Sequence, residues 1–185
     1  MNRWQLTQAV RTLRRGGVIA YPTEAVYGLG CDPLDARAVM RLLALKQRPV
    51  EKGLILIAAD MDQLTPFLAP LSEEDRARLA ATWPGPVTWL VPARPETPTW
   101  LRGAHQTLAV RVTAHPLAAA LCRAAGQAMV STSANPGGRP PARNAMQVRR
   151  YFSDRLDAII AGPLGVEARP TVIRDLTSGR LHRPG

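Results

Sequence analysis

The sequence has only two cysteines, Cys31 and Cys122, and no long hydrophobic run. Two cysteines are too few for the disulfide framework of a small secreted domain. The longest purely apolar stretch, residues 54–59, is about a third of the ~20 residues that a membrane-spanning helix needs. Residues 1–17 lack the apolar segment and the small-residue cleavage site of a secretory signal. We therefore expect a cytoplasmic protein without a membrane segment.

The motifs of several common functional sites are also missing. Gly28 and Gly30 follow a predicted strand, but Pro33 stands where a dinucleotide-binding loop has its third glycine. No GxxxxGKS or GxxxxGKT phosphate-binding loop occurs, and no GxSxG sequence marks a serine nucleophile. The three histidines stand apart, without the spacing of zinc ligands. These absences argue against a Rossmann fold, a P-loop enzyme, a serine hydrolase and a zinc site.

Acidic residues are much fewer than basic ones. The chain has 24 lysines and arginines against 14 aspartates and glutamates, which gives a net charge of +10. Between Thr97 and Ser153 there are seven arginines and no carboxylate. This excess predicts an anionic partner, either a nucleotide or RNA. The alternatives are a solvated surface, or ion pairs with acidic residues from the first half of the chain.

Lysine is scarce among these basic residues. The two lysines, Lys46 and Lys52, lie close together on either side of Arg48, and every other basic residue is an arginine. A compact ammonium group suits a phosphate site, so this cluster is a candidate phosphate-binding site. The alternative is that Lys46 and Arg48 are cations that stabilise the C-terminus of the preceding helix.

Hydrophobic periodicity, together with glycine and proline breaks, predicts helices and strands mixed along the chain. The predicted helices are residues 2–15, 35–46, 72–83, 115–125 and 144–152. The predicted strands are residues 18–21, 54–58, 87–91, 108–112, 128–131, 158–160, 171–175 and 181–183, and residues 27–30 are predicted to form a glycine-rich loop. Strict alternation is absent, so we expect an α/β sandwich with a mixed, twisted open sheet, in one domain over residues 1–185.

Polar residues gather near the ends of the predicted strands. They are Thr23, Glu24, Lys46, Arg48, Lys52, Thr107, Arg111, Ser131, Thr132, Ser133 and Asn135. Strand-end loops bind ligands in α/β sheets, and a set rich in cations and hydroxyls suits anion binding and the alignment of reactants. The alternatives are that Ser133 and Asn135 bond to their own turn, and that Arg111 is buried in a structural ion pair.

Several short motifs, in a fixed order, make the sequence similar to a known family. They are Tyr21-Pro22-Thr23-Glu24-x-Val26-Tyr27-Gly28-Leu29-Gly30, Lys46-x-Arg48-Pro49, Trp83-Pro84-Gly85-Pro86-x-Thr88, Ala109-Val110-Arg111-Val112, Ser133-Ala134-Asn135 and Arg183-Pro184-Gly185. In order and spacing they resemble the YrdC/Sua5 family of threonylcarbamoyl-AMP synthases over essentially the whole chain. The length is similar to that of the short, single-domain bacterial members. The resemblance implies a YrdC/RibB-like α/β sandwich with a concave basic cleft.

The resemblance also implies a nucleotidyltransferase reaction. L-Threonine, bicarbonate or CO2, and ATP would give L-threonylcarbamoyladenylate and diphosphate. Downstream tRNA-modifying proteins would take the adenylate and modify the adenosine beside the anticodon in tRNAs that read codons starting with A. Mg2+ would enter through the ATP phosphates, with no metal ligand from the protein. A direct contact with tRNA is left open.

Site residues follow from the same resemblance. On the ATP side it implies Lys46, Arg48, Lys52, Thr107, Ser133, Asn135 and Arg183, with Lys46 and Arg48 acting in catalysis. On the threonine side it implies Thr23, Arg111, Ser131 and Thr171. The Arg111 guanidinium would form a fork with the threonine carboxylate, and Asn135 would orient its own loop.

Three positions depart from the pattern of longer family members. Ala25 stands where these often have threonine, Ile57 where they often have histidine, and Pro141 where some have serine. The family pattern therefore defines the threonine pocket less closely than the phosphate side.

An alternative function is RNA binding without catalysis. The arginine-rich, carboxylate-free stretch would suit a module for tRNA or double-stranded RNA, or a ribosome-maturation factor. The sequence has only nine aromatic residues for base stacking and no RRM, KH or dsRBD signature. An enzymatic function is therefore the favoured hypothesis.

Overall fold

A mixed β-sheet runs through the molecule. The computed structural model describes residues 2–166 and 171–183, and in these the strand order is β7-β1-β2-β6-β3-β5-β4-β8-β9. The strands are β1 (Ile19–Pro22), β2 (Tyr27–Gly30), β3 (Ile55–Ala58), β4 (Val87–Pro92), β5 (Thr107–Val112), β6 (Met129–Ser133), β7 (Ala158–Ile159), β8 (Val172–Asp175) and β9 (Leu181–Arg183). The pairs β1/β7, β3/β5 and β4/β8 are parallel, and the other neighbours are antiparallel.

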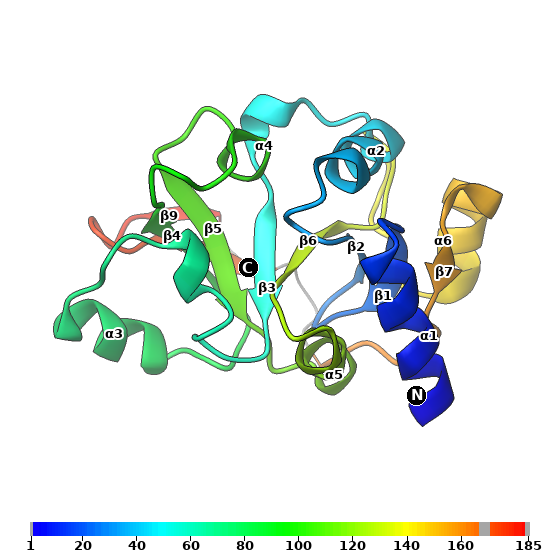
Figure 1. Cartoon of the computed structure of the whole chain (residues 1–185), viewed down its shortest axis with the longest axis horizontal. Coiled ribbons are helices and arrows are strands. Elements are labelled where there is room, and N and C mark those ends of the chain that lie inside the picture. Colours follow the sequence, from blue (N-terminus) through cyan, green and yellow to red (C-terminus); the bar gives the residue numbers. More distant parts are fainter. Residues whose placement is uncertain (1, 167–170, 184–185) are drawn as a thin grey trace.

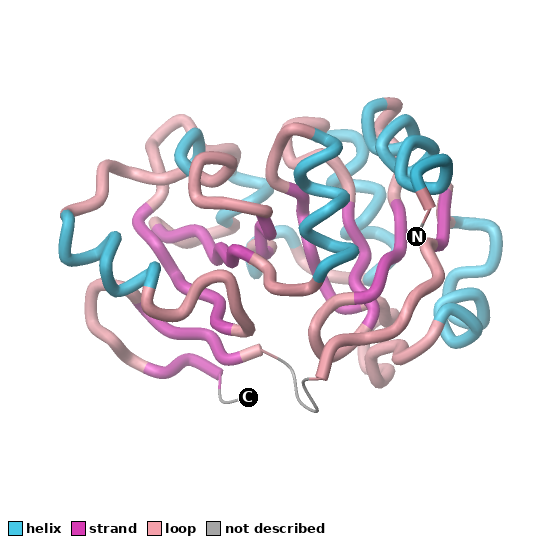
Figure 2. The backbone as a smooth tube through the Cα atoms, turned by 90° about the horizontal axis from the view of Figure 1, so that it is seen from below, coloured by secondary structure: helices cyan, strands magenta, loops and turns pink. Residues whose placement is uncertain are grey.

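Helices and loops surround this sheet (Figures 1 and 2). The helices are α1 (Arg3–Arg14), α2 (Ala36–Lys46), α3 (Glu73–Ala80), α4 (Thr99–Arg102), α5 (Pro116–Ala125) and α6 (Ala145–Phe152), with short 3-10 turns η1 (Val50–Lys52), η2 (Thr65–Phe67) and η3 (Ser153–Arg155). The side chains of Asn2, Asp35, Ser72 and Asn144 accept hydrogen bonds from backbone N–H groups at four helix starts, which supports the predicted starts. No helix in the described part of the chain has the length and apolar content to cross a membrane.

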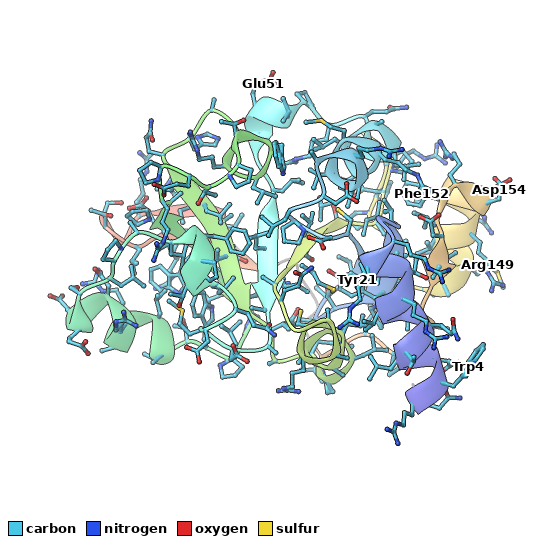
Figure 3. All side chains as sticks on the ribbon, viewed as in Figure 1. Trp4, Tyr21, Glu51, Arg149, Phe152 and Asp154 are labelled. Carbon is cyan, nitrogen blue, oxygen red and sulfur yellow. The ribbon has the colours of Figure 1, made fainter. Side chains whose placement is uncertain are left out.

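The sheet buries two separate groups of hydrophobic side chains, one on each face. Along β3, Leu56 belongs to the larger core, which includes residues of α2, α3, α4 and α6. The next residue, Ile57, packs in the smaller core with Tyr21 and residues of α1 and α5. Figure 3 shows Tyr21 inside the molecule, whereas Trp4 projects from α1 into solvent. Because Ile57 lies opposite Arg111, that arginine is on the same face of the sheet as α1 and α5.

The predicted fold class, a mixed open sheet with helices packed on it, is confirmed. One local prediction was wrong: residues 27–30 form strand β2, not a glycine-rich loop. Their backbone pairs with β1 on one side and β6 on the other, and this pairing overrides the low strand preference of glycine. A Cβ atom at Gly30 would lie 2.6 Å from the Val130 carbonyl oxygen, so a glycine is required there for close packing.

Candidate functional site

One cavity collects most of the predicted site residues. It has a volume of about 490 Å3, and eight of the eleven predicted residues line it: Thr23, Arg48, Lys52, Thr107, Arg111, Ser131, Ser133 and Thr171. These residues come from five strands or their flanking loops, and they are separated by up to 148 positions in the chain (from 23 to 171). The strand-end residues of the sequence therefore do converge on one place.

Strand β5 gives the cavity its long direction. Thr107, Ala109 and Arg111 alternate along one face of this strand and all line the cavity. Four residues of extended chain span roughly 13 Å, so the two polar side chains are well separated. The strand register places Ser131, Ile55, Ala109, Leu90 and Asp175 in one row across the sheet. The small Ala109 side chain in the middle of that row leaves room between a Thr107 end and an Arg111 end.

The Thr107 end of the cavity is cationic. Arg48 and Lys52 line it. They lie just before β3, which runs parallel to β5, so they belong to the same end of this strand pair as Thr107. The Arg48 Nε and Nη2 atoms donate hydrogen bonds to the Gly53 carbonyl oxygen, at 3.1 and 2.9 Å. These bonds fix the guanidinium against the turn that carries Lys52. Burial lowers the pKa of the Arg48 guanidinium.

A close approach of two loops adds a third cation to this end. A Cβ atom at Gly53 would lie 2.9 Å from the Arg102 carbonyl oxygen, and Gly53 itself has a φ of +61°. The Leu54 N–H donates to the Leu101 carbonyl oxygen at 2.8 Å. Arg102, at the end of α4, therefore joins Arg48 and Lys52 in the lining, which concentrates positive charge where an anion could bind.

The other end of the cavity is built around Arg111, which is only 4% exposed. Its Nη1 atom donates to the hydroxyl oxygens of Thr88 at 3.2 Å and Thr171 at 3.0 Å. Its Nη2 atom lies 3.3 Å from Oε2 of Glu24, and both side chains of this ion pair are buried. The Thr113 hydroxyl donates to Oε1 of Glu24 at 2.6 Å.

This network fixes the charge of the buried carboxylate. Burial alone would raise the pKa of the Glu24 carboxyl, but the Arg111 guanidinium and the Thr113 hydroxyl outweigh burial and hold that pKa below its ordinary value. Arg111 thus has the structural ion pair that the sequence left open, and it also lines the cavity. The two interpretations are compatible.

Lys46 and Asn135 lie behind the described lining of the cavity. The Lys46 ammonium donates to the Ser133 carbonyl oxygen at 2.6 Å, to the Asn135 carbonyl oxygen at 3.0 Å and to Asn135 Oδ1 at 3.1 Å. Asn135 Nδ2 in turn donates to the Arg139 carbonyl oxygen at 2.7 Å. Burial, together with the nearby Arg48 charge, lowers the pKa of Lys46 to about 8. In this geometry Lys46 and Asn135 hold the loop after β6 and present the Ser133 side chain to the cavity.

Some residues of the lining were given no role in the sequence analysis. They are Val26, Arg102, His105, Asp175 and His182, among others. Asp175 and His182 belong to the β8–β9 end of the sheet, where β4 separates β8 from β5. Only the strand order, which is not visible in the sequence, brings them to the same cavity as β5. Arg183 lies in β9. Its side chain, and Pro184 and Gly185 of the closing motif, lie outside the described residues.

The lining chemistry favours anion binding over proton transfer. Asp175 is the one carboxylate among the described lining residues, and it accepts hydrogen bonds from the Ser178 N–H and hydroxyl at 2.7 Å each. Within residues 2–166 and 171–183 there is no group of three or more His, Cys, Asp or Glu side chains that would hold a metal ion. Four guanidinium or ammonium groups and several hydroxyls surround the cavity, so it suits the alignment of anionic reactants.

The sequence is similar to that of a curated threonylcarbamoyl-AMP synthase. A threonylcarbamoyl-AMP synthase of Cellvibrio japonicus is 57% identical over 180 residues, which cover 97% of this chain and 95% of the relative. The family model Sua5_yciO_yrdC, described as "Telomere recombination", matches residues 11–185.

Solved structures agree with this match. P. abyssi Sua5, solved in complex with L-threonine, aligns with a TM-score of 0.93 at 33% identity. The alignment covers the whole of this chain and 55% of that protein, so this chain spans about half the length of Sua5. E. coli YciO aligns with a TM-score of 0.87 at 29% identity, over 98% of this chain and 89% of YciO. The chain therefore belongs to the Sua5/YciO/YrdC family.

Proposed function

We propose that this protein is a threonylcarbamoyl-AMP synthase, a nucleotidyltransferase that converts L-threonine, bicarbonate or CO2, and ATP to L-threonylcarbamoyladenylate and diphosphate. The observation that carries the proposal is the cavity that has Arg48, Lys52 and Arg102 toward one end and Arg111 at the other. Such an arrangement suits a triphosphate and an amino-acid carboxylate bound end to end. The name of the relative that is 57% identical over nearly the full length supports the same activity.

Threonine would bind at the Arg111 end. Its carboxylate would take the guanidinium as partner, and the hydroxyl groups of Ser131 and Thr171 offer further hydrogen bonds nearby. Thr23 lies in the same lining, although its hydroxyl already donates to the Val26 carbonyl oxygen at 2.7 Å. The amino group of the bound threonine would then point along β5, toward the phosphates.

ATP would bind at the cationic end. Arg48 and Lys52 would neutralise the triphosphate, and the Thr107 hydroxyl would donate a hydrogen bond to the nucleotide. Ser133 would lie beside the nucleotide, although its hydroxyl already donates to Asn135 Oδ1 at 2.6 Å. Lys46 and Asn135 would act mainly by holding the Ser133 loop, as their hydrogen bonds indicate. Mg2+ would enter as part of the ATP substrate, because the described residues of the lining include a single carboxylate.

The chemistry then needs alignment more than acid or base groups. The neutral amine of threonine attacks CO2, so that an N–C bond forms and one C–O π bond of CO2 breaks. The nitrogen then loses one proton to solvent water, which leaves a carbamate. A carbamate oxygen attacks the α-phosphorus of ATP, and the bond from that phosphorus to the oxygen bridging to the β-phosphate breaks. Diphosphate leaves with its charge offset by Arg48 and Lys52. Holding both reactants in one site is the main contribution of this cavity.

The product adenylate is a reactive mixed anhydride, so tRNA-modifying proteins would consume it in the same compartment. We place the reaction in the cytoplasm, where Cys31 and Cys122, both free and buried, would stay reduced.

The decisive experiment measures pyrophosphate release from ATP and tests whether this release requires both threonine and bicarbonate. The purified chain is expected to release pyrophosphate only when both are present, and mass spectrometry of a short incubation should detect threonylcarbamoyl-AMP. Release that does not depend on threonine, or none at all, would contradict the proposed function.

A second candidate function, RNA binding, is favoured by one observation. Arg143, Arg149 and Arg150 are exposed on and beside α6, in the stretch without carboxylates. If RNA binding is the main task, tRNA should bind with sub-micromolar affinity at physiological salt, with a steep decrease as salt rises. Weak binding with full enzymatic activity would leave these arginines as a solvated surface.

A further inference from the structure

Behind Arg111 stands a carboxylate that the proposed reaction does not use directly. Glu24 is 5% exposed and is not among the lining residues of the cavity, whereas Arg111 lines it. The two charged groups approach to 3.3 Å. Glu24 therefore touches the side of the guanidinium that faces away from the substrate space.

Glu24 is itself held in place by several segments of the chain. Thr113, just after β5, donates its hydroxyl to Glu24 Oε1 at 2.6 Å, and the Thr113 hydroxyl oxygen accepts from the His115 N–H at 3.2 Å. On the other side, a Cβ atom at Gly165 would lie 2.8 Å from the Glu24 carbonyl oxygen, so the 162–166 loop packs closely on its backbone. A carboxylate fixed in this way can set the position of the group that it contacts.

The contacts of Arg111 show what this carboxylate supplies. The Nη1 atom bonds two threonine hydroxyls, which are neutral, and Glu24 is the one carboxylate within ion-pair distance in the described part of the chain. Arg111 Nε and Glu24 Oε2 are buried without hydrogen-bond partners among the described residues. Without Glu24, a guanidinium in this environment would be an uncompensated buried charge and would be free to turn toward another partner.

We propose that Glu24 is a positioning residue, whose carboxylate fixes the Arg111 guanidinium at one end of the cavity in the orientation that receives the carboxylate of an amino-acid substrate. This inference rests on the proposed function, in which that amino acid is threonine. Glu24 does not touch the reacting atoms and acts through Arg111, at the amino-acid end of the cavity. Its removal should therefore weaken the binding of the amino acid far more than the binding of ATP. Removal of a residue that merely stabilised the fold would change the KM values for both substrates alike.

The test compares steady-state kinetics of Glu24→Gln, Glu24→Asp and the wild type, with threonine and ATP varied separately. In Glu24→Gln the KM for threonine should rise at least tenfold, while the KM for ATP stays within about twofold. Glu24→Asp keeps the charge on a side chain that is one methylene shorter. Its KM for threonine should therefore lie between that of the wild type and that of Glu24→Gln. The matched control is Glu73→Gln, the same chemical change on a side chain that is 97% exposed on α3; it should leave both KM values unchanged.

Thr113→Val gives a second test if Glu24→Gln does not fold. Valine has nearly the shape of threonine but cannot donate to Glu24, so the KM for threonine should rise about threefold and that for ATP should not change. Thermal unfolding of each variant shows whether it is folded at the assay temperature, and Glu24→Asp and Thr113→Val then decide the question on their own.

Two results would overturn the inference. A lower KM for threonine in Glu24→Gln would mean that Glu24 competes with the substrate for Arg111 instead of orienting it. Equal changes in the KM values for threonine and ATP would mean a general structural role. These results differ from failure of the proposed function, in which the wild type itself would release no threonine-dependent pyrophosphate and the inference would fall with it.

Discussion

At the scale of single residues, Arg111 combines two roles that are often considered alternatives. Its burial would be costly without a counter-charge, and Glu24 provides one. Its position on β5, on the same face as Thr107, makes it part of the cavity wall. The hydroxyl groups of Thr88 and Thr171, which accept hydrogen bonds from Nη1, further fix the orientation of the guanidinium. The ion pair therefore prepares the arginine for a ligand instead of removing it from binding.

Replacing Arg111 with lysine tests its role in binding. Lysine keeps the positive charge but cannot form the two parallel hydrogen bonds of a guanidinium–carboxylate fork. Loss of one charge-assisted hydrogen bond costs about 1.5–3 kcal/mol, which corresponds to a rise of roughly 10- to 100-fold in the KM for threonine. The KM for ATP should change little. Equal effects on the two substrates in steady-state assays would contradict this assignment.

The Glu24 carboxylate also predicts a dependence of stability on pH. Its pKa in the folded protein lies below the unfolded value of 4.5, so the native state favours the ionised form. The contribution of the ionised Glu24 carboxylate to the free energy of unfolding is complete above about pH 4.5. It is lost as the pH falls through the lower pKa that Glu24 has in the folded protein. Wild type should therefore unfold at a higher urea concentration than Glu24→Gln at pH 7, and the difference should shrink below pH 4.5. A difference that grows on acidification would contradict the ion pair.

Sequence reasoning located the site residues better than it described their contacts. Residue type and strand-end position were enough to select Arg48, Lys52 and Arg111, which the structure brings to one cavity. The hydrogen bonds of Lys46 to Ser133 and Asn135 cross 87 and 89 positions of sequence, and no local pattern encodes them. The sequence placed Glu24 after a strand and within the first family motif but gave it no role, because its pairing with Arg111 depends on the three-dimensional arrangement.

At the scale of elements, β2 shows how tertiary contacts decide local structure. Gly30 packs against Tyr21 of β1 and the Val130 carbonyl oxygen of β6, so a glycine allows the three strands to pack closely. Gly30→Ala would place its Cβ 2.8 Å from Tyr21 Cε1, and we expect a loss of about 1–3 kcal/mol in the free energy of unfolding from overpacking. Urea denaturation measures this loss.

Gly137→Ala is the matched control for that experiment. Its added Cβ would meet its nearest neighbours at 3.5 Å or more, which is ordinary contact. Its unfolding free energy should therefore stay within about 0.5 kcal/mol of the wild type. Equal losses in both variants would show that close packing at β2 is not the cause.

The elements with strong periodicity were predicted within a few residues. The predicted helix 35–46 is α2, Ala36–Lys46, and the predicted strand 108–112 is β5, Thr107–Val112. The helix predicted for residues 72–83 is shorter and ends at Ala80, because the following residues form turns before the Pro84-Gly85-Pro86 segment. The order of strands was not predictable, since β6 lies between β2 and β3 through long-range pairing that leaves no local signal.

At the scale of the whole molecule, the two faces of the sheet have different tasks. The larger hydrophobic core covers one face, while the other is shared between the α1/α5 core and the cavity. Arg111 lies where these two regions meet, in register with the buried Ile57. The amino-acid end of the site is therefore anchored in the packed part of the molecule, and the cationic end is formed by loops around Lys52, which is exposed.

This division predicts that the two substrates stabilise the protein separately. A ligand at 100 times its Kd adds about 2.7 kcal/mol to stability, which for a chain of this length raises Tm by roughly 5–10 °C. Arg111→Lys should lose most of the Tm shift caused by threonine and keep the shift caused by a non-hydrolysable ATP analogue. Lys52→Ala should show the reverse, because its ammonium lies at the phosphate end of the lining. If either variant lost both shifts, the two ends of the cavity would not be independent binding regions, and the assignment of one substrate to each end would be wrong.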